Sequence, residues 1–301
     1  MTIRVRDFIY LDMERVRSIV AQLEEGLIES YTKTTGEGTE GTGGVEGGLL
    51  GIVKLAGGVK FLLERRETET KTLHDHVYNK VEEALLSQGT VIRIPGDISA
   101  PAVADGTYVD SIDETSFVLA SGRVAINDFA NMRTYLDSFN KMAAFIAYCS
   151  GVSGKDDESV QDRNKRTKQL EQGMKLDKKL IDGFKLTFDL FYGERVAIKL
   201  TPYDEYPDFR LVGDLNEIFL RDKLSSITYK YGSSPVSEWT ILGQVASIPP
   251  ETPPEIPKAT RGSAIPLALE GVFDAYRGLE QMAQSVVYPE IAITPIAIYR
   301  G

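Results

Sequence analysis

The chain has 301 residues, enough for one large domain or two smaller ones, and either could bury a substantial core. Its 42% hydrophobic and 26% charged residues are typical of a folded protein and exclude a disordered chain. The formal net charge of −10 opposes general nucleic-acid binding, because phosphate binding needs clustered lysine and arginine, and it equally opposes attraction to anionic lipid.

The N-terminal segment predicts a strand, a cap and an amphipathic helix, in that order. Residues 8–11 form a short apolar run with aromatic and β-branched side chains, typical of a buried strand. Asp12 is expected to cap the following helix, whose apolar residues recur at helical spacing as far as Leu27.

Residues 36–58 contain ten glycines and predict a special loop. Each glycine costs a helix about 1 kcal/mol relative to alanine, so the first half of this segment is not expected to be helical. The run lacks the GxxxxGK[ST] pattern of a phosphate-binding loop, and Glu46 stands where a phosphate would lie. We therefore interpret residues 36–48 as a surface loop that orders on partner binding. The apolar residues 49–63 are either core or interface.

The middle of the chain predicts a helix from about residue 72 to 88, a strand at 90–94, and further strands near 107–112 and 116–120. Gly122 is expected to turn the chain into another strand. Asn127 or Asp128 then caps a long helix, near whose end Cys149 is expected to be buried. The apolar face of this helix comprises Phe129, Met132, Leu136, Phe139, Met142 and Ile146.

The C-terminal part begins with a charged stretch, residues 151–183, interpreted as a linker or an exposed helix. Strands are expected at several places beyond it, including 185–192 and 226–231. Residues 249–257 form a proline-rich connector. A final helix and a closing strand follow, and the apolar face of that helix comprises Leu269, Val272, Phe273, Tyr276, Leu279 and Val286.

These elements predict an α+β fold with mixed or antiparallel sheets, three or four amphipathic helices and two subdomains. The first subdomain is expected over residues 1–150 and carries the glycine-rich loop. The second is expected over residues 184–301, is rich in β-strands, and includes the proline-rich connector and the final helix.

Several short motifs together resemble a prokaryotic protein family of uncharacterised function. They are the opening Phe8-Ile9-Tyr10-Leu11-Asp12, then Lys71-Thr72-Leu73-His74-Asp75, Gly122-Arg123-Val124 leading into Asn127-Asp128-Phe129, and Lys230-Tyr231-Gly232-Ser233. The resemblance covers most of the chain in order. It implies a bacterial or archaeal cytoplasmic protein, and it implies no activity, cofactor or catalytic residue.

No catalytic motif, metal site or cofactor is predicted. His74 and His76 are the only histidines, but positions two apart on a helix point about 200° apart and would not share one metal ion. No GxSxG elbow is present, and Trp239 is expected to pack in the core. Candidate partner-binding residues lie in the glycine loop and in a proline-flanked tyrosine segment: Gly43, Gly44, Gly47, Gly48, Leu49, Leu50, Tyr203 and Tyr206.

The sequence therefore favours a non-enzymatic interaction or regulatory protein, binding a protein partner or itself, in a prokaryotic multi-gene system of the defence type. A lone cysteine, the absence of a signal-peptide h-region and the absence of a long apolar stretch predict a cytoplasmic protein, and the net charge of −10 predicts that it binds no nucleic acid. One alternative is a membrane-acting effector that inserts residues 45–63 after a conformational change. Another is a nucleotide-sensing or hydrolytic protein with a site that no motif marks.

Overall fold

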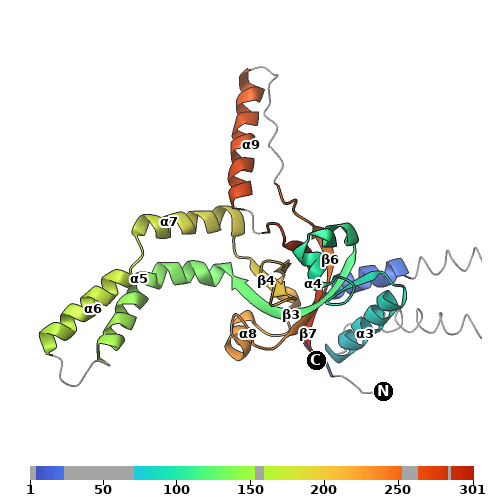
Figure 1. The fold of residues 1–301 in the computed structure, drawn as a ribbon, viewed down its shortest axis with the longest axis horizontal. Coiled ribbons are helices and arrows are strands. Elements are labelled where there is room, and N and C mark those ends of the chain that lie inside the picture. Colours follow the sequence, from blue (N-terminus) through green and yellow to red (C-terminus); the bar gives the residue numbers. More distant parts are fainter. Residues whose placement is uncertain (1–4, 24–70, 153–158, 253–263, 284–285) are drawn as a thin grey trace, which may run out of the picture. The chain divides into compact units, whose positions relative to one another are not determined.

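The computed structural model describes residues 5–23, 71–152, 159–252, 264–283 and 286–301. They combine several helices with a mixed β-sheet, which confirms the predicted α+β class (Figure 1). The chain divides into two compact units. Unit 1 comprises Met1–Ala125, Lys199–Pro249 and Tyr288–Gly301, and unit 2 comprises Ile126–Ile198 and Pro250–Val287. Both units are assembled from segments far apart in the sequence, whereas the sequence pattern predicts consecutive subdomains.

The sheet contains seven strands among the described residues. Its hydrogen-bonded pairs close a circuit that runs β3, β6, β7, β5, β4 and back to β3, while β1 joins β7 and β2 joins β3. Strands β2 and β5 pair in parallel with their neighbours β3 and β7, and the pairs of β6 and of β1 are antiparallel. The strands are β1 (Asp7–Leu11), β2 (Val91–Ile94), β3 (Phe117–Asp128), β4 (Val196–Thr201), β5 (Leu211–Leu215), β6 (Trp239–Ser247) and β7 (Ile291–Arg300).

The core of unit 1 forms where two helices pack against β1 and β7. Phe8, Val16, Tyr78 and Tyr299 belong to one buried cluster, so the first strand, the helix of residues 13–23 and α3 share apolar contacts with the last strand. Asp12 accepts hydrogen bonds from the backbone N–H groups of residues 14 and 15, both at 3.0 Å, which confirms the predicted cap. The other short elements of this unit are α4 (Ala100–Ala104), η1 (Thr107–Ser111), η3 (Glu217–Phe219) and α8 (Leu224–Tyr231), beside α3 (Lys71–Ser87).

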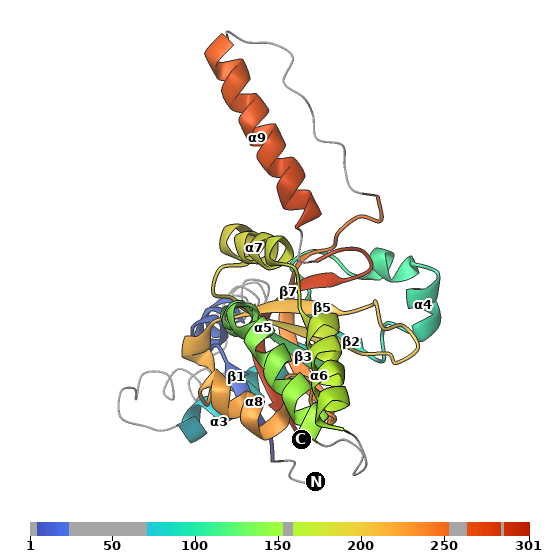
Figure 2. The same cartoon turned by 90° about the vertical axis from the view of Figure 1, so that its left-hand side faces the viewer.

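Unit 2 is built from helices. Helix α6 runs back along α5, and the two lie side by side in both views (Figures 1 and 2). The Asn140 side chain joins them to the segment that follows α6, because it donates to the Leu176 carbonyl at 3.1 Å and accepts from its N–H at 3.0 Å. The helices are α5 (Phe129–Val152), α6 (Val160–Met174), α7 (Lys178–Thr187), the π-helical turn η2 (Phe188–Tyr192) and α9 (Ala264–Met282).

Three segments expected as strands are helical. Residues 185–192 lie in α7 and η2, and Asp177 caps α7 by accepting from the N–H of Lys179 at 2.7 Å. Residues 226–231 lie in α8, which ends at Gly232 with a φ of 76°. Residues 107–111 form η1, which follows Gly106 at a φ of 79°. In each case the alternation of apolar residues was also compatible with a helical spacing, and local caps and turns favoured the helix.

Gly122 lies inside strand β3, so the expected turn at this position is wrong. A Cβ atom on Gly122 would lie 2.2 Å from the carbonyl oxygen of Thr201 and 2.8 Å from the Cα of Pro202. Only a residue without a side chain allows this approach of two backbones within the sheet.

We expect Gly122→Ala to destabilise the protein by more than about 2 kcal/mol, because the backbone of Thr201 must move to admit a methyl group. Thermal unfolding followed by circular dichroism measures the change. Gly183→Ala is the matched control, since nothing lies within 4 Å of a Cβ at this position inside α7, and it is expected to raise stability slightly. Equal melting temperatures for Gly122→Ala and the wild type would contradict the steric account.

Candidate functional site

Exposed apolar side chains gather on the helices of unit 2. Among the described residues, 25 large hydrophobic side chains are exposed, and 19 of them belong to unit 2. Of the 44 buried hydrophobic residues in the part of the chain that the structure describes, only six belong to this unit. A monomeric protein rarely exposes contiguous apolar patches beyond a few hundred Å², so this concentration marks the helices as a candidate interaction surface.

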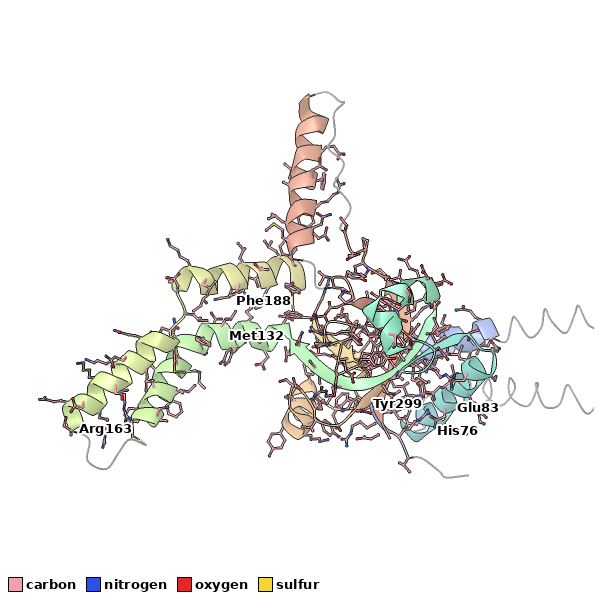
Figure 3. The ribbon with its side chains drawn as sticks, in the orientation of Figure 1. His76, Glu83, Met132, Arg163, Phe188 and Tyr299 are labelled. Atoms are coloured by element: carbon pink, nitrogen blue, oxygen red, sulfur yellow. The ribbon has the colours of Figure 1, made fainter. Side chains whose placement is uncertain are left out.

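Helix α5 carries small residues on the face toward α6 and large residues on another face. Ala143 and Ala147 are buried, at 2% and 0% exposure. A Cβ on Gly151 would lie 2.1 Å from the Thr167 hydroxyl of α6, so the two helices approach closely there. The large side chains of α5 that are 41–63% exposed are Met132, Tyr135, Met142, Phe145, Ile146 and Tyr148. Of these, Met132 is labelled on α5 in Figure 3.

Helix α9 also presents an apolar face. Phe191 stacks on Tyr276 with ring centroids 6.1 Å apart, and the Tyr192 hydroxyl donates to the Ala283 carbonyl at 2.7 Å, so the end of η2 meets α9. Despite these contacts the apolar face of α9 remains open to solvent. Its side chains that are 49–87% exposed are Leu269, Val272, Phe273, Tyr276, Leu279 and Met282.

Charges differ among the helices of unit 2. Helix α6 has four basic and two acidic residues, and α7 has three basic residues and one acidic residue. Helix α9 has one basic and three acidic residues. The salt bridges Arg133–Asp189, at 2.8 Å, and Lys185–Asp137 join α5 to η2 and α7, so part of this charge stabilises the unit itself. The surface therefore combines apolar and charged regions, as the core and rim of an interface do.

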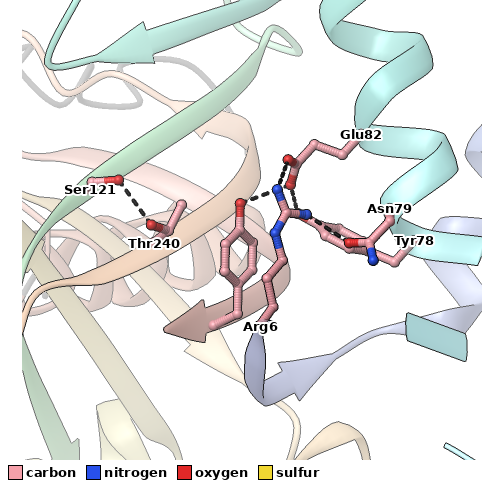
Figure 4. Close-up of polar contacts among 7 residues, drawn as sticks. Arg6, Tyr78, Asn79, Glu82, Ser121 and Thr240 are labelled. Carbon is pink, nitrogen blue, oxygen red and sulfur yellow. Dashed lines mark hydrogen bonds and ion pairs between the residues drawn. The ribbon is translucent and has the colours of Figure 1, made fainter. Parts of the chain in front are cut away.

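A second candidate lies in unit 1, where Glu82 on α3 is a buried carboxylate with only 5% exposure of its side chain (Figure 4). It accepts hydrogen bonds from the hydroxyl groups of Tyr78, at 2.6 Å, and Tyr299, at 2.8 Å. Arg6 donates to it at 2.5 Å, and donates also to Asn79 at 2.8 Å. The guanidinium lies 4.4 Å from the ring centre of Tyr299, within cation–π range.

This cluster joins three parts of unit 1, since Arg6 precedes β1, Glu82 belongs to α3 and Tyr299 to β7. Both oxygens of the carboxylate have donors, so its charge is compensated within the fold. Burial and the charge of Glu82 raise the pKa of Tyr78 and of Tyr299. A carboxylate held in this way stabilises the packing of α3 on the sheet, and we assign it a structural role.

Comparison with protein-family models identifies a match over residues 5–299 to a domain of unknown function, DUF6414. The chain belongs to this family. The match spans segments of both units and confirms the resemblance to an uncharacterised family that the sequence motifs indicated. No curated protein and no solved structure matches the chain significantly.

The two tyrosines predicted to bind a partner in this DUF6414 chain lie on one turn. Tyr203 is half-buried, its hydroxyl donates to the Ile98 carbonyl at 2.5 Å, and its ring lies 6.3 Å from that of Phe209. Tyr206 is partly exposed beside it. The structure thus uses Tyr203 to anchor the turn, and a binding role for the pair stays a prediction. The other six predicted residues, Gly43, Gly44, Gly47, Gly48, Leu49 and Leu50, lie outside the described residues.

The histidine segment of the DUF6414 chain lies on α3. Burial lowers the pKa of His74, and the nearby cations Arg221 and Arg17 lower it further. Asp75 pairs with Arg221, and His76 is exposed. Within the described ranges no three metal-ligating side chains come together, and none of the helices there has the length and apolar content to cross a membrane.

The exposed apolar helices of unit 2 were not among the predicted sites, although the sequence of α5 contains a sign of them. The apolar residues of α5 extend around more of the helix than one buried face requires, and Phe145 and Tyr148 fall outside the face chosen for the core. Cys149 is exposed, so its expected burial is wrong. The helix packs on α6 through its small residues instead.

We expect Glu82→Gln to destabilise the DUF6414 protein by about 2–4 kcal/mol, because the substitution leaves the part-buried Arg6 guanidinium without its counter-charge. Urea unfolding followed by fluorescence of Trp239, the only tryptophan and 1% exposed, measures the change. Glu83→Gln on the same helix is the control, since Glu83 is 69% exposed and pairs only with a surface lysine. A loss for Glu82→Gln no larger than for the control would refute the cluster's role.

Alkaline pH should also weaken this cluster. The pKa of Tyr78 and Tyr299 is raised above the ordinary value of 10.0, so the folded state holds protons that the unfolded state releases. The resulting stabilisation is complete below pH 10 and decreases as the pH rises toward the folded-state pKa. Urea midpoints should stay level between about pH 8 and 9 and fall between about pH 10 and 11, and the midpoints of Tyr299→Phe should fall less steeply. Tyr229→Phe, at a position 91% exposed, should follow the wild-type slope, and parallel slopes for all three proteins would exclude the mechanism.

Proposed function

We propose that this DUF6414 chain is a non-enzymatic interaction or regulatory protein that binds a protein partner or further copies of itself through the helices of unit 2. The observation that carries the proposal is the concentration of exposed large apolar residues on α5, α7 and α9. Burial of such residues by a partner stabilises the complex by about 25 cal/mol per Å² of apolar surface removed from water.

The division of work between the units supports this proposal. Unit 1 has a buried core that spans β1, α3 and β7, with its buried carboxylate neutralised by hydrogen bonds. Unit 2 buries few hydrophobic residues and exposes many. In this proposal unit 1 supplies the stable scaffold, and unit 2 supplies the apolar surface that partners recognise.

The cellular setting is part of the proposal. From the resemblance of the sequence motifs to a prokaryotic family, we propose a prokaryotic, cytoplasmic protein that acts in a multi-gene system such as phage defence. The glycine-rich segment 36–58 would serve as a second contact region, together with the turn at Tyr203 and Tyr206.

One observation favours a second candidate, a membrane-acting effector. The basic residues of α6 and α7 lie in the same unit as exposed apolar side chains, a combination that suits the surface of an anionic bilayer. Insertion of residues 45–63 would be a separate step of this function. Flotation with vesicles that contain a third of anionic lipid separates the two candidates, because a protein-binding surface does not require lipid.

The proposed function predicts an assembly larger than the 33.3 kDa chain, either with the purified protein or in an extract of cells that express it natively. Light scattering after gel filtration measures the mass of the purified protein, and native electrophoresis of the tagged chain measures the size of its assembly in the extract. The combined substitutions Leu186→Ser, Val272→Ser and Leu279→Ser remove exposed apolar side chains of α7 and α9 and should reduce the assembly found in the extract by about tenfold or more.

The control replaces two exposed apolar residues of unit 1, Ile218→Ser and Val236→Ser, at positions 74% and 96% exposed. This variant should assemble like the wild type. A chain that is monomeric both when purified and in the extract, or an equal loss for both variants, would overturn the proposed function.

A further inference from the structure

One face of α5 has the residue spacing of a coiled-coil seam. Its members are separated by alternating steps of three and four residues along most of the helix. Four of them are large side chains that are 41–48% exposed, Phe139 is partly exposed, and Cys149 at the end is exposed. We call this face the α5 stripe, and it comprises Met132, Tyr135, Phe139, Met142, Ile146 and Cys149.

The charged residues of α5 lie off the stripe. Arg133, Asp137 and Lys141 occupy other positions of the heptad, and the stripe itself has no formal charge. Two copies of the stripe therefore meet without the repulsion that two like-charged helices would show. A membrane surface or an oppositely charged partner would draw its affinity from charge, which the stripe does not offer.

The order of residues along the stripe is complementary to itself when one copy is reversed. In an antiparallel pair Met132 faces Cys149, Tyr135 faces Ile146 and Phe139 faces Met142, with no residue left over. Each aromatic ring then meets an aliphatic or thioether side chain, and contact of methionine sulfur with an aromatic ring is favourable. A parallel pair would place each aromatic ring against its own copy.

We propose that the α5 stripe is the contact between two copies of this chain, which associate as a two-fold symmetric dimer with antiparallel α5 helices. The proposal rests on the proposed function and assigns a partner to one part of its surface. An isologous interface of this kind closes on itself and yields a dimer without further growth.

The available area suits a dimer. With about 150–250 Å² for each large aromatic residue, the exposed parts of the stripe and of the adjacent Phe145 amount to roughly 400–500 Å² per chain. A standard interface buries about 800 Å² per partner, so the stripe would form its apolar centre and the flanking polar residues its rim. The inner face of α5 remains on α6 throughout, because Gly151 lies against Thr167 and accepts a hydrogen bond from Arg166 of α6 at 3.2 Å.

The single cysteine of the chain provides a direct test. Under mild oxidation, Met132→Cys should give a disulfide-linked dimer between the introduced thiol of one copy and Cys149 of the other. The two positions are about 26 Å apart along one helix, so no disulfide can form within a chain. The wild type, whose cysteines lie at opposite ends of the dimer, should remain uncrosslinked, as should Met132→Cys combined with Cys149→Ser.

A second pair of variants tests the stripe without oxidation. Ile146→Lys places a charge within the stripe and should raise the dimer dissociation constant by about tenfold or more, measured by sedimentation equilibrium. Tyr148→Lys introduces the same charge at an exposed position on the opposite side of α5 and should leave the constant unchanged. Circular dichroism verifies that both variants keep the helical content of the wild type.

The outcomes separate this proposal from the proposed function. A purified chain that is monomeric at all concentrations but joins another protein through unit 2 would refute the dimer and leave the proposed function intact. Crosslinking of the wild type at Cys149 alone would refute the antiparallel arrangement. Binding to anionic vesicles that Ile146→Glu abolishes would reassign the stripe to a membrane, and would refute both the dimer and the proposed function.

Discussion

The pairing of β7 along both edges is the constraint on which unit 1 depends. On one edge β7 pairs with β6 over most of its length, and on the other it pairs first with β5 and then with β1. The last strand of the chain therefore positions the first one. The N–H of Asp12 donates to the Ile296 carbonyl at 2.8 Å, so the start of the first helix is fixed by the same strand. Tyr299 near the end of β7 then places a hydroxyl on Glu82 and joins α3 to this arrangement.

The two units use hydrophobic residues in opposite ways. In unit 1 a charged group can be buried because Tyr78, Tyr299 and Arg6 all direct donors toward Glu82. In unit 2 the α5–α6 contact relies on small residues and close approach, and the large side chains are left at the surface. Such a unit buries few of its hydrophobic residues by itself, so a partner that covers it would add to its stability by mass action.

Much of the fold could be predicted from the sequence, because many segments adopt in the folded chain the strand or helix that their own apolar pattern and capping residues favour. Apolar patterning and helix capping predicted the strand at 8–11, the cap at Asp12, the cap at Asp128 and the long helix after it. Asp128 accepts a hydrogen bond from the N–H of residue 131 at 2.8 Å. Trp239 is buried as expected. The prediction was wrong where the apolar residues of a segment fit both the two-residue repeat of a strand and the 3.6-residue repeat of a helix, as at 226–231. Caps and tertiary contacts then decide between strand and helix.

The candidate surface could not be predicted, because periodicity identifies an apolar face but not what covers it. On α5 the sequence offered one face of large residues, which the usual logic of an amphipathic helix assigns to the core. The structure instead packs Ala143, Ala147 and Gly151 toward α6, where small side chains let the helices approach closely. This choice bears on the proposed function. A helix that used its large residues for its own core would have no apolar surface left to offer, whereas α5 is fixed in place by its alanines and keeps its methionine, tyrosine and isoleucine side chains available for association.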